Sequence, residues 1–569
     1  MGPAGVSGRV LVAPLYALVL AVAVTAPLFA PGYLLLRDAV STPRSYPTDA
    51  ALGLSEAAPR ALPQDFLLAV ASSVVDGGVV VKALLVAGLW LAGWGAARLS
   101  AVLLPDAGVG GQCVAATVAI WNPYVAERLL QGHWSLLVGY GCLPWVAAAM
   151  LRLRTAPGEG APFAALVFWI AAAGLTPTGL ILAAIVALVG VAVPGAGRPR
   201  RQCAAVALAA ATISALPWLT AAALAQTLSP SQAAGVVPFA ARAEPGLGTL
   251  LSLAGLGGIW NSEAVPASRT TTFAIVGTAV LLAIVVAGAT VALRRPAARP
   301  LLGLAAVAVA APALMATGPG LAALEALVTA LPGLGVLRDG QKWVALAMPG
   351  YAVAGAAATT LLRRVPAAAT ALACCAALLA VLPDLAWGVG GQVVSVRYPA
   401  AWPAVAELVN ADPRPVAVLP PGSMRRFEWA GPAPVLDPLP RWVRAEVRST
   451  GDLTIGGRTV PGEGTHAREV EQLLLAGADQ ERLAAAGVGW VVVELPGTRS
   501  AAVDLDLPVS YRDDDLVLYR VGGEAETRPG TRPVQVATHL AWLALLAAGP
   551  LAAAQAWRRR SAVSPEPPR

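Results

Sequence analysis

The chain has 569 residues, of which 57% are hydrophobic and only 13% are charged, and its mean hydropathy is +0.66. This composition excludes an ordinary soluble protein and predicts a membrane protein. The formal net charge is +7, but much of the clustered positive charge lies in short segments between apolar stretches. It therefore indicates orientation and contact with anionic lipid, and we expect no nucleic-acid partner.

The apolar stretches are long enough for about twelve bilayer crossings at roughly 20 residues each. We place them at 10–30, 79–104, 109–121, 135–151, 162–193 (two short segments), 202–225, 271–293, 300–316, 343–362, 366–387 and 536–557. The first stretch could be a secretory signal that ends near Ala26-Pro27, but its length and the arginine pattern favour an uncleaved crossing. Within 162–193, Thr176-Pro177-Thr178-Gly179 predicts a tight turn or a broken helix.

Five arginine clusters fall at alternate junctions between these stretches, at 152–154, 198–201, 294–299, 363–364 and 558–560. The positive-inside rule then places both termini in the cytoplasm of a multi-pass cell-membrane protein, with the longer alternate loops outside. All five cysteines lie within apolar stretches and lack metal-ligand spacing, so we interpret them as structural thiols.

The composition changes to that of a soluble protein between residues 388 and 533. Short strands are predicted at 416–419, 490–493 and 516–519, and helical spacing at 400–410 and 466–486. The sequence thus predicts an α-helical polytopic membrane domain in 1–387, an extracytoplasmic α/β domain in 388–533, and a final transmembrane helix with a basic cytoplasmic tail in 534–569.

Asp38 is the sharpest candidate for chemistry, because it follows the first crossing by only a few residues and is held near the membrane surface. A carboxylate there can act as a general base on a substrate that arrives from the lipid phase. The alternative is an interfacial acid paired with Arg37 or Arg44.

A second outer segment runs from Trp121 to Trp134. Asn122-Pro123 breaks the preceding helix. A short interfacial stretch then contains the polar residues Glu127, Arg128, Gln131 and His133. Such a stretch could line a polar pocket, or it could be an aromatic belt with a Glu-Arg pair that stabilises a re-entrant turn.

Arg338 and Lys342 precede the crossing at 343–362 on the predicted outer side, where the positive-inside rule does not account for them. They could bind a lipid phosphate or pyrophosphate, since arginine gives bidentate contacts and lysine a point charge. Snorkelling to headgroups is the alternative.

Together, Asp38, the stretch Asn122 to Leu129, the Thr176–Gly179 break and the stretch Leu337 to Lys342 resemble actinobacterial membrane glycosyltransferases of the GT-C type. Within that type, the chain is similar to the mycobacterial arabinofuranosyltransferases and to the polyprenyl-phosphomannose-dependent mannosyltransferases. The resemblance covers about the first two-thirds of the chain.

The resemblance implies transfer of a sugar from a polyprenyl-phosphate donor to an extracytoplasmic glycan or protein acceptor. It implies that Asp38 is the catalytic base, that Arg338 and Lys342 hold the phosphate, and that Glu127, Arg128 and His133 line the pocket. Many such proteins have two adjacent acids in the first outer loop, whereas this chain has Arg37-Asp38-Ala39, which does not favour a metal-binding role there. We therefore assign no metal ligand, and the sequence does not decide whether the reaction uses a divalent metal.

Two other functions fit the same pattern. A transporter or lipid flippase often has a similar number of crossings, although no internal repeat is visible. A non-catalytic scaffold for cell-envelope assembly would use the outer domain to bind a partner. The sequence contains no Walker loop, no Gly-x-Ser-x-Gly elbow and no His-Glu-x-x-His helix.

Overall fold

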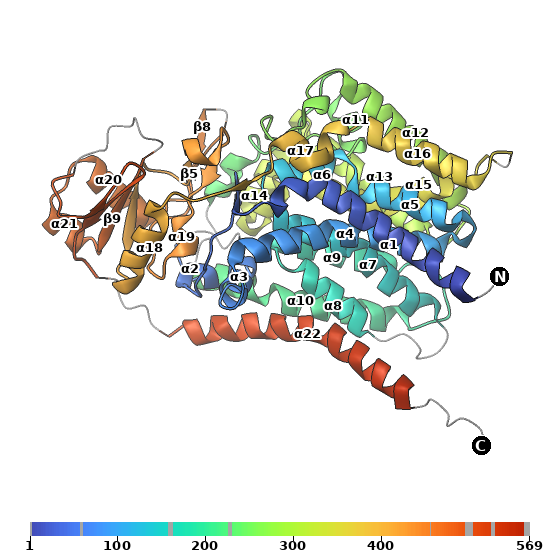
Figure 1. Cartoon of the computed structure of the whole chain (residues 1–569), viewed down its shortest axis with the longest axis horizontal. Coiled ribbons are helices and arrows are strands. Elements are labelled where there is room, and N and C mark those ends of the chain that lie inside the picture. Colours follow the sequence, from blue (N-terminus) through green and yellow to red (C-terminus); the bar gives the residue numbers. More distant parts are fainter. Residues whose placement is uncertain are drawn as a thin grey trace.

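The computed structural model describes residues 3–56, 61–156, 163–225, 230–362, 364–455, 457–495, 505–524 and 530–562. A helical bundle occupies one end of the molecule and a smaller α/β domain the other (Figure 1). Arg363 and the tail beyond residue 562, both parts of predicted cytoplasmic segments, lie outside the described residues.

Six helices of the described part are long and apolar enough to cross a membrane. They belong to α1 (Pro3–Thr25, with apolar residues continuing to Phe29), α4 (Gly77–Leu103), α7 (Trp134–Thr155), α10 (Arg200–Ala225), α12 (Phe273–Ala292) and α22 (Arg532–Ala562).

Two bent pairs raise the number to eight if each pair is one span. In the first, α13 (Arg299–Met315) meets α14 (Gly318–Ala330) at 90°. In the second, α16 (Ala367–Ala380) meets the segment Pro383–Gly391, which contains α17 (Ala386–Gly391), at 72°.

Several predicted crossings correspond to shorter helices, namely α5 (Gly108–Ile120), α8 (Ala164–Ala173), α9 (Pro177–Gly190) and α15 (Met348–Ala358). A helix of 13 residues such as α5 rises only about 20 Å, short of the roughly 30 Å hydrocarbon core. The described part therefore supports six to eight spans by length and composition, and the count of about twelve stays a prediction.

The break predicted at Thr176–Gly179 is confirmed, because α8 ends at Ala173 and α9 begins at Pro177. The Thr176 hydroxyl accepts a hydrogen bond from the Gly179 N–H at 3.0 Å and caps the new helix. Proline at the first helical position needs no N–H partner there.

One large apolar core runs through α4, α5, α7 and α15, where Leu89, Val118, Leu143 and Val353 are fully buried. Apolar side chains on the outer surface of the bundle, such as Val19, Leu208 and Val286, are more than half exposed. Such an apolar exterior fits a bundle surrounded by lipid.

The α/β domain contains the strands predicted from the sequence. Its four-stranded sheet has the order β10-β11-β9-β4, with β4 (Val416–Leu419), β9 (Trp490–Glu494), β10 (Val509–Arg512) and β11 (Leu516–Arg520). β4 and β9 are parallel, and the other neighbours are antiparallel. Val491 and Val492 point into separate cores on opposite faces, as strand alternation requires.

The remaining elements of this domain are short. The helices are α18 (Ala401–Ala411), α19 (Leu439–Trp442), α20 (Thr465–Leu475) and α21 (Gln480–Ala485), so the predicted helical segment 466–486 consists of two helices. The hairpins are β5 (Met424–Arg425) with β6 (Val435–Leu436) and β7 (Leu453–Ile455) with β8 (Arg458–Val460).

A three-stranded sheet joins two segments that are far apart in the sequence. In it, β1 (Tyr33–Leu36) lies between β2 (Ala39–Val40) and β3 (Ser395–Val396). Four small helices, α2 (Asp49–Leu52), α3 (Gln64–Ala71), α6 (Pro123–Leu130) and α11 (Thr249–Ala254), complete the described helices. The three-stranded sheet of β1, β2 and β3 therefore connects the bundle to the α/β domain.

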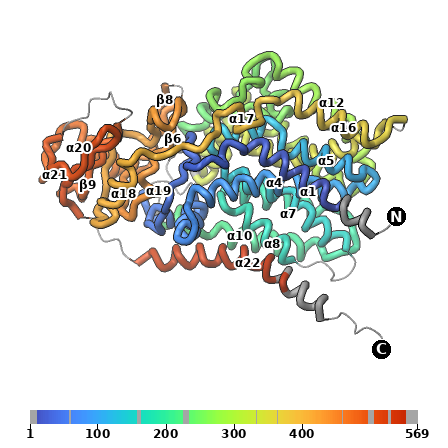
Figure 2. The backbone as a smooth tube through the Cα atoms, viewed as in Figure 1, coloured from blue at the N-terminus to red at the C-terminus, as the bar shows by residue number. Residues whose placement is uncertain are grey.

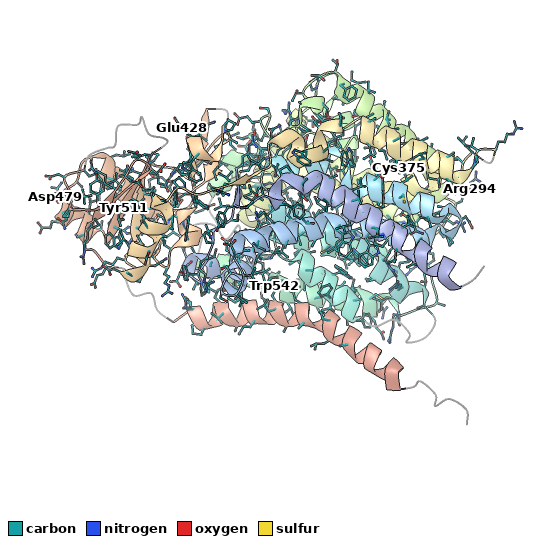
Figure 3. The ribbon with its side chains drawn as sticks, viewed as in Figure 1. Arg294, Cys375, Glu428, Asp479, Tyr511 and Trp542 are labelled. Carbon is teal, nitrogen blue, oxygen red and sulfur yellow. The ribbon has the colours of Figure 1, made fainter. Side chains whose placement is uncertain are left out.

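The coloured part of α1 begins at the end of the molecule opposite the α/β domain, and the coloured part of α22 runs toward that same end (Figure 2). Arg294, from one of the arginine clusters, lies at this terminal end, whereas Asp479 and Tyr511 lie at the far side of the α/β domain (Figure 3). The long helix α22 returns along the bundle and packs against α8 and α10.

Candidate functional site

Asp38 lies at the turn of a two-residue hairpin between β1 and β2, where Leu36 pairs with Ala39. Its neighbour Arg37 has a φ of 48°, which such a tight turn requires. The Arg37 guanidinium donates to the carbonyl oxygens of Leu130 at 2.6 Å and Glu263 at 2.7 Å. Arg37 is thus used to fix the hairpin to two other segments.

The Asp38 carboxylate is held through one oxygen. Oδ2 accepts hydrogen bonds from His133 Nε2 at 2.9 Å and Gln131 Nε2 at 3.1 Å, while no bond to Oδ1 is found among the described residues. The side chain is 37% exposed. The alternative pairing with Arg37 or Arg44 is not observed in the described part, because Arg44 donates to Ser45, Ala69 and Ser72 instead.

The hairpin approaches the segment after α6 very closely. Gly132 has a φ of +82°, and a Cβ there would lie 2.3 Å from both the Ala39 nitrogen and the Leu36 oxygen. The Asp38 N–H also donates to the Gln131 carbonyl at 3.2 Å. Only glycine allows this backbone approach, which places Asp38 beside His133.

The local sequence explains why the polar residues of α6 gather here. The Asn122 side chain accepts from the Val125 N–H at 3.1 Å, and Pro123 occupies the first helical position, so α6 begins sharply. His133 immediately precedes α7. Because α7 has 22 residues, the Arg152 and Arg154 cluster near its other end lies about 30 Å away.

Arg128 connects His133 to the segment around Asp339. It donates to Asp339 through two bonds of 2.9 and 3.0 Å, to His133 Nδ1 at 3.1 Å and to the Gln341 side-chain oxygen. The Arg128 side chain is completely buried. It therefore lies behind His133 and contributes no open surface to the site.

Glu127 is also buried and supports the loop after α11. Its carboxylate accepts from the N–H groups of Gly258 and Ile259, both at 3.1 Å, and from Gln341 Nε2 at 2.9 Å. Burial raises its pKa, and the nearby Glu244 adds to that effect. Thus Glu127, like Arg128, is a buried residue that holds neighbouring segments together and contributes no open surface to the site.

Lys342 belongs to the 3-10 segment Gly340–Ala347. Its Nζ lies 3.6 Å from Asp339 Oδ2, and 25% of the side chain is exposed. Burial lowers its pKa and Asp339 opposes that effect. Lys342 in turn helps to lower the pKa of Asp38, which places the two groups within electrostatic reach.

Arg338 lies in a different environment. Its guanidinium stacks over the Phe239 ring, 4.4 Å from the centroid, and Phe239 contacts Trp260 edge to face. The Arg338 charge is therefore presented on an aromatic platform from the segment before α11. Arg338 also lies within electrostatic reach of Lys342, whose pKa it helps to lower.

The charges of the cluster favour an ionised Asp38 carboxylate. Burial opposes ionisation of Asp38, but the hydrogen bond and charge of His133, together with Gln131 and Lys342, lower its pKa. Burial likewise opposes ionisation of Asp339, and Arg128 and Lys342 lower its pKa. Burial lowers the pKa of His133, which Asp38 partly restores.

Asp339, Gln341 and Gln131 are hydrogen-bond partners of the predicted site residues, and the sequence analysis gave them no role. Asp339 and Gln341 lie within the polar run Leu337 to Lys342, and Gln131 lies between Arg128 and His133. Their positions in these polar stretches could have indicated that they belong to the site. Their partners could not be identified, since Arg128 and Asp339 are 211 residues apart.

The α/β domain contributes backbone to the same hairpin. The Arg37 N–H donates to the Pro434 carbonyl at 2.8 Å, and the Leu436 N–H donates to the Arg37 carbonyl at 2.9 Å. The Tyr398 hydroxyl donates to the Ser41 carbonyl at 2.9 Å. The domain is therefore part of the framework that positions Asp38.

Within the described residues, no group of three or more His, Cys, Asp or Glu side chains is arranged to hold a metal ion. The cysteines are free thiols, three of them buried, in or beside the helices of the bundle. The structure brings together the Asp38 carboxylate, the His133 imidazole and the cations Arg128 and Lys342.

Apolar spans, bent helix pairs and a terminal α/β domain define a multi-pass membrane protein. The structure of arabinofuranosyltransferase AftD from Mycobacteria aligns with a TM-score of 0.56 and 18% identity, over 90% of this chain and 40% of that chain. A mutant of AftD aligns with a TM-score of 0.50 and 18% identity, over 90% and 41%.

The predicted resemblance to mycobacterial arabinofuranosyltransferases is thereby confirmed at the level of the fold. The chain spans about two-fifths of the length of AftD, covering 40% of it. Neither a protein-family model nor a curated protein sequence matches the chain.

Proposed function

We propose that this protein is a membrane glycosyltransferase that moves a sugar from a polyprenyl-phosphate donor to an extracytoplasmic cell-envelope glycan or protein. The observation that carries the proposal is the Asp38 carboxylate, held by Oδ2 and open at Oδ1, in electrostatic reach of the Lys342 ammonium. The AftD-like fold supports the same class of reaction.

The proposed step uses these groups in defined roles. Asp38 Oδ1 accepts the proton of an acceptor hydroxyl as its oxygen bonds to the anomeric carbon of the donor sugar. The bond from that carbon to the phosphate oxygen breaks, and its electron pair leaves with the phosphate. Lys342 and Arg338 stabilise the charge on the departing lipid phosphate.

The same proposal places the site at the outer membrane surface and both termini in the cytoplasm. The Asp38 cluster lies at the start of α7, and Arg152 and Arg154 lie in its last turn. If the arginines are cytoplasmic, as the positive-inside rule expects, the Asp38 cluster is on the outer side. The polar groups at the end of a span argue against a transporter, whose substrate site lies near the bilayer midplane.

The test is transfer of radiolabelled sugar in proteoliposomes, with arabinofuranosyl polyprenyl phosphate as the first donor because of the AftD-like fold. Asp38→Asn removes the base while its amide oxygen can still accept from His133. We expect a loss of about 10²- to 10⁴-fold, the usual contribution of general acid–base catalysis.

The matched control is Asp106→Asn, since Asp106 is 74% exposed and pairs with Arg295 away from the site. This variant should transfer sugar at the wild-type rate. Unchanged transfer by folded, membrane-inserted Asp38→Asn would show that Asp38 is not the base. Absence of transfer from every donor tried would favour a flippase or a non-catalytic assembly scaffold.

A further inference from the structure

His133 has a different hydrogen-bond partner on each ring nitrogen. A guanidinium can donate but cannot accept, so Arg128 must donate to His133 Nδ1, 3.1 Å away. Nδ1 therefore carries no proton. The neutral ring has its proton on Nε2, which donates to Asp38 Oδ2 at 2.9 Å.

Arg128 is itself held firmly in place. Two bonds to Asp339 and one to Gln341 restrain a guanidinium that is fully buried. Gln341 donates in turn to Glu127, whose carboxylate is fixed by two backbone N–H groups. This network prevents Arg128 from turning away to let Nδ1 gain a proton.

Three charged groups face His133, from three separate segments. Asp38 on the β1–β2 hairpin favours a charged ring, whereas Arg128 on α6 and Lys342 on the segment Gly340–Ala347 oppose it. Asp339 lies behind Arg128 and neutralises part of its charge. Burial acts in the same direction as the two cations.

We infer that His133 is a positioning residue of the proposed transfer reaction: Arg128 fixes it as the neutral Nε2–H tautomer, and it holds Asp38 Oδ2 so that Oδ1 meets the acceptor hydroxyl. This inference rests on the proposed function. The acceptor proton goes to Asp38 and is not passed to His133, because Nε2 already carries a proton and Nδ1 is blocked.

The tautomer can be measured without any activity assay. The chain contains three histidines, so ¹⁵N-histidine labelling in nanodiscs gives few signals, and His133→Gln assigns the one of interest. We expect one protonated and one unprotonated nitrogen at pH 7, with the proton on Nε2. A doubly protonated ring, or a proton on Nδ1, would overturn the inference.

Two substitutions then separate positioning from proton transfer. His133→Gln puts an amide N–H near the position of the imidazole Nε2, and we expect transfer within tenfold of wild type and an unchanged acid limb of the pH profile. His133→Phe removes the donor, so kcat should fall at least tenfold and the acid limb should move to higher pH. His466→Gln, in the α/β domain, is the control with wild-type behaviour.

The outcomes distinguish the possible roles. If His133→Gln were as inactive as Asp38→Asn, His133 would be a proton acceptor and the inference would be wrong. If folded His133→Phe kept both the wild-type kcat and pH profile, His133 would not position Asp38. If the wild type itself transferred no sugar, the proposed function would fail, while the NMR result would still decide the tautomer.

Discussion

Replacing Gly132 by alanine tests how closely the Asp38 hairpin must approach the end of α6. The new Cβ would lie 2.3 Å from the Ala39 nitrogen and the Leu36 oxygen and 2.9 Å from the Asp38 nitrogen. All three are backbone atoms, so no flexible side chain can move aside. The hairpin would have to shift by about 1 Å to reach ordinary contact at 3.4 Å.

Two costs add at this position. A left-handed backbone costs a non-glycine residue about 1–2 kcal/mol, and the φ of Gly132 is +82°. Forcing an extra carbon into a packed site costs about 1–3 kcal/mol more. We therefore expect the substitution to lower the free energy of unfolding by about 2–5 kcal/mol.

The effect on transfer should be larger than the loss of folded protein explains. Misplacement of a catalytic group by about 1 Å can cost roughly 10²-fold in rate. The assay is kcat for sugar transfer per folded molecule, with folding measured by thermal unfolding in detergent. Folded Gly132→Ala with wild-type kcat would refute the reasoning.

Gly477→Ala is the matched control for backbone strain. Gly477 follows α20 with a φ of +70°, and a Cβ there meets no atom within 4 Å. Its substitution should cost only the strain of about 1–2 kcal/mol and leave kcat unchanged. A similar loss of transfer in both variants would mean that strain, and not the hairpin contact, explains the effect.

Three further predictions follow from the same cluster. The pKa of Asp38 lies below 3.8 and that of His133 below 6.5, so transfer should not depend on pH above about 6.5; an acid limb centred above pH 7 would contradict this. Lys342→Gln should raise the KM for the lipid donor about 10- to 100-fold, because a charge-assisted contact worth about 1.5–3 kcal/mol is lost, and an unchanged KM would exclude phosphate binding by Lys342. Glu244→Gln should lower the free energy of unfolding by about 3 kcal/mol, since it leaves the buried Arg269 charge unpaired, and an unfolding titration that matches wild type would show that the pair is dispensable.

The sequence by itself determined the local features of the fold. Proline, glycine and capping residues define where α6 and α9 begin, because their backbone preferences act within a few residues. Short apolar runs likewise predicted β4, β9 and β11, because strands buried on both faces are apolar along their whole length.

Only the tertiary structure decided the partners of the polar residues. Asp38 and His133 are 95 residues apart, and Arg128 and Asp339 are 211 apart. Local spacing offered Arg37 or Arg44 as an alternative partner of Asp38, yet packing of the hairpin against Gly132 brought His133 instead. A hydrogen bond depends on which segments meet, and that is set by the burial of apolar surface over the whole bundle.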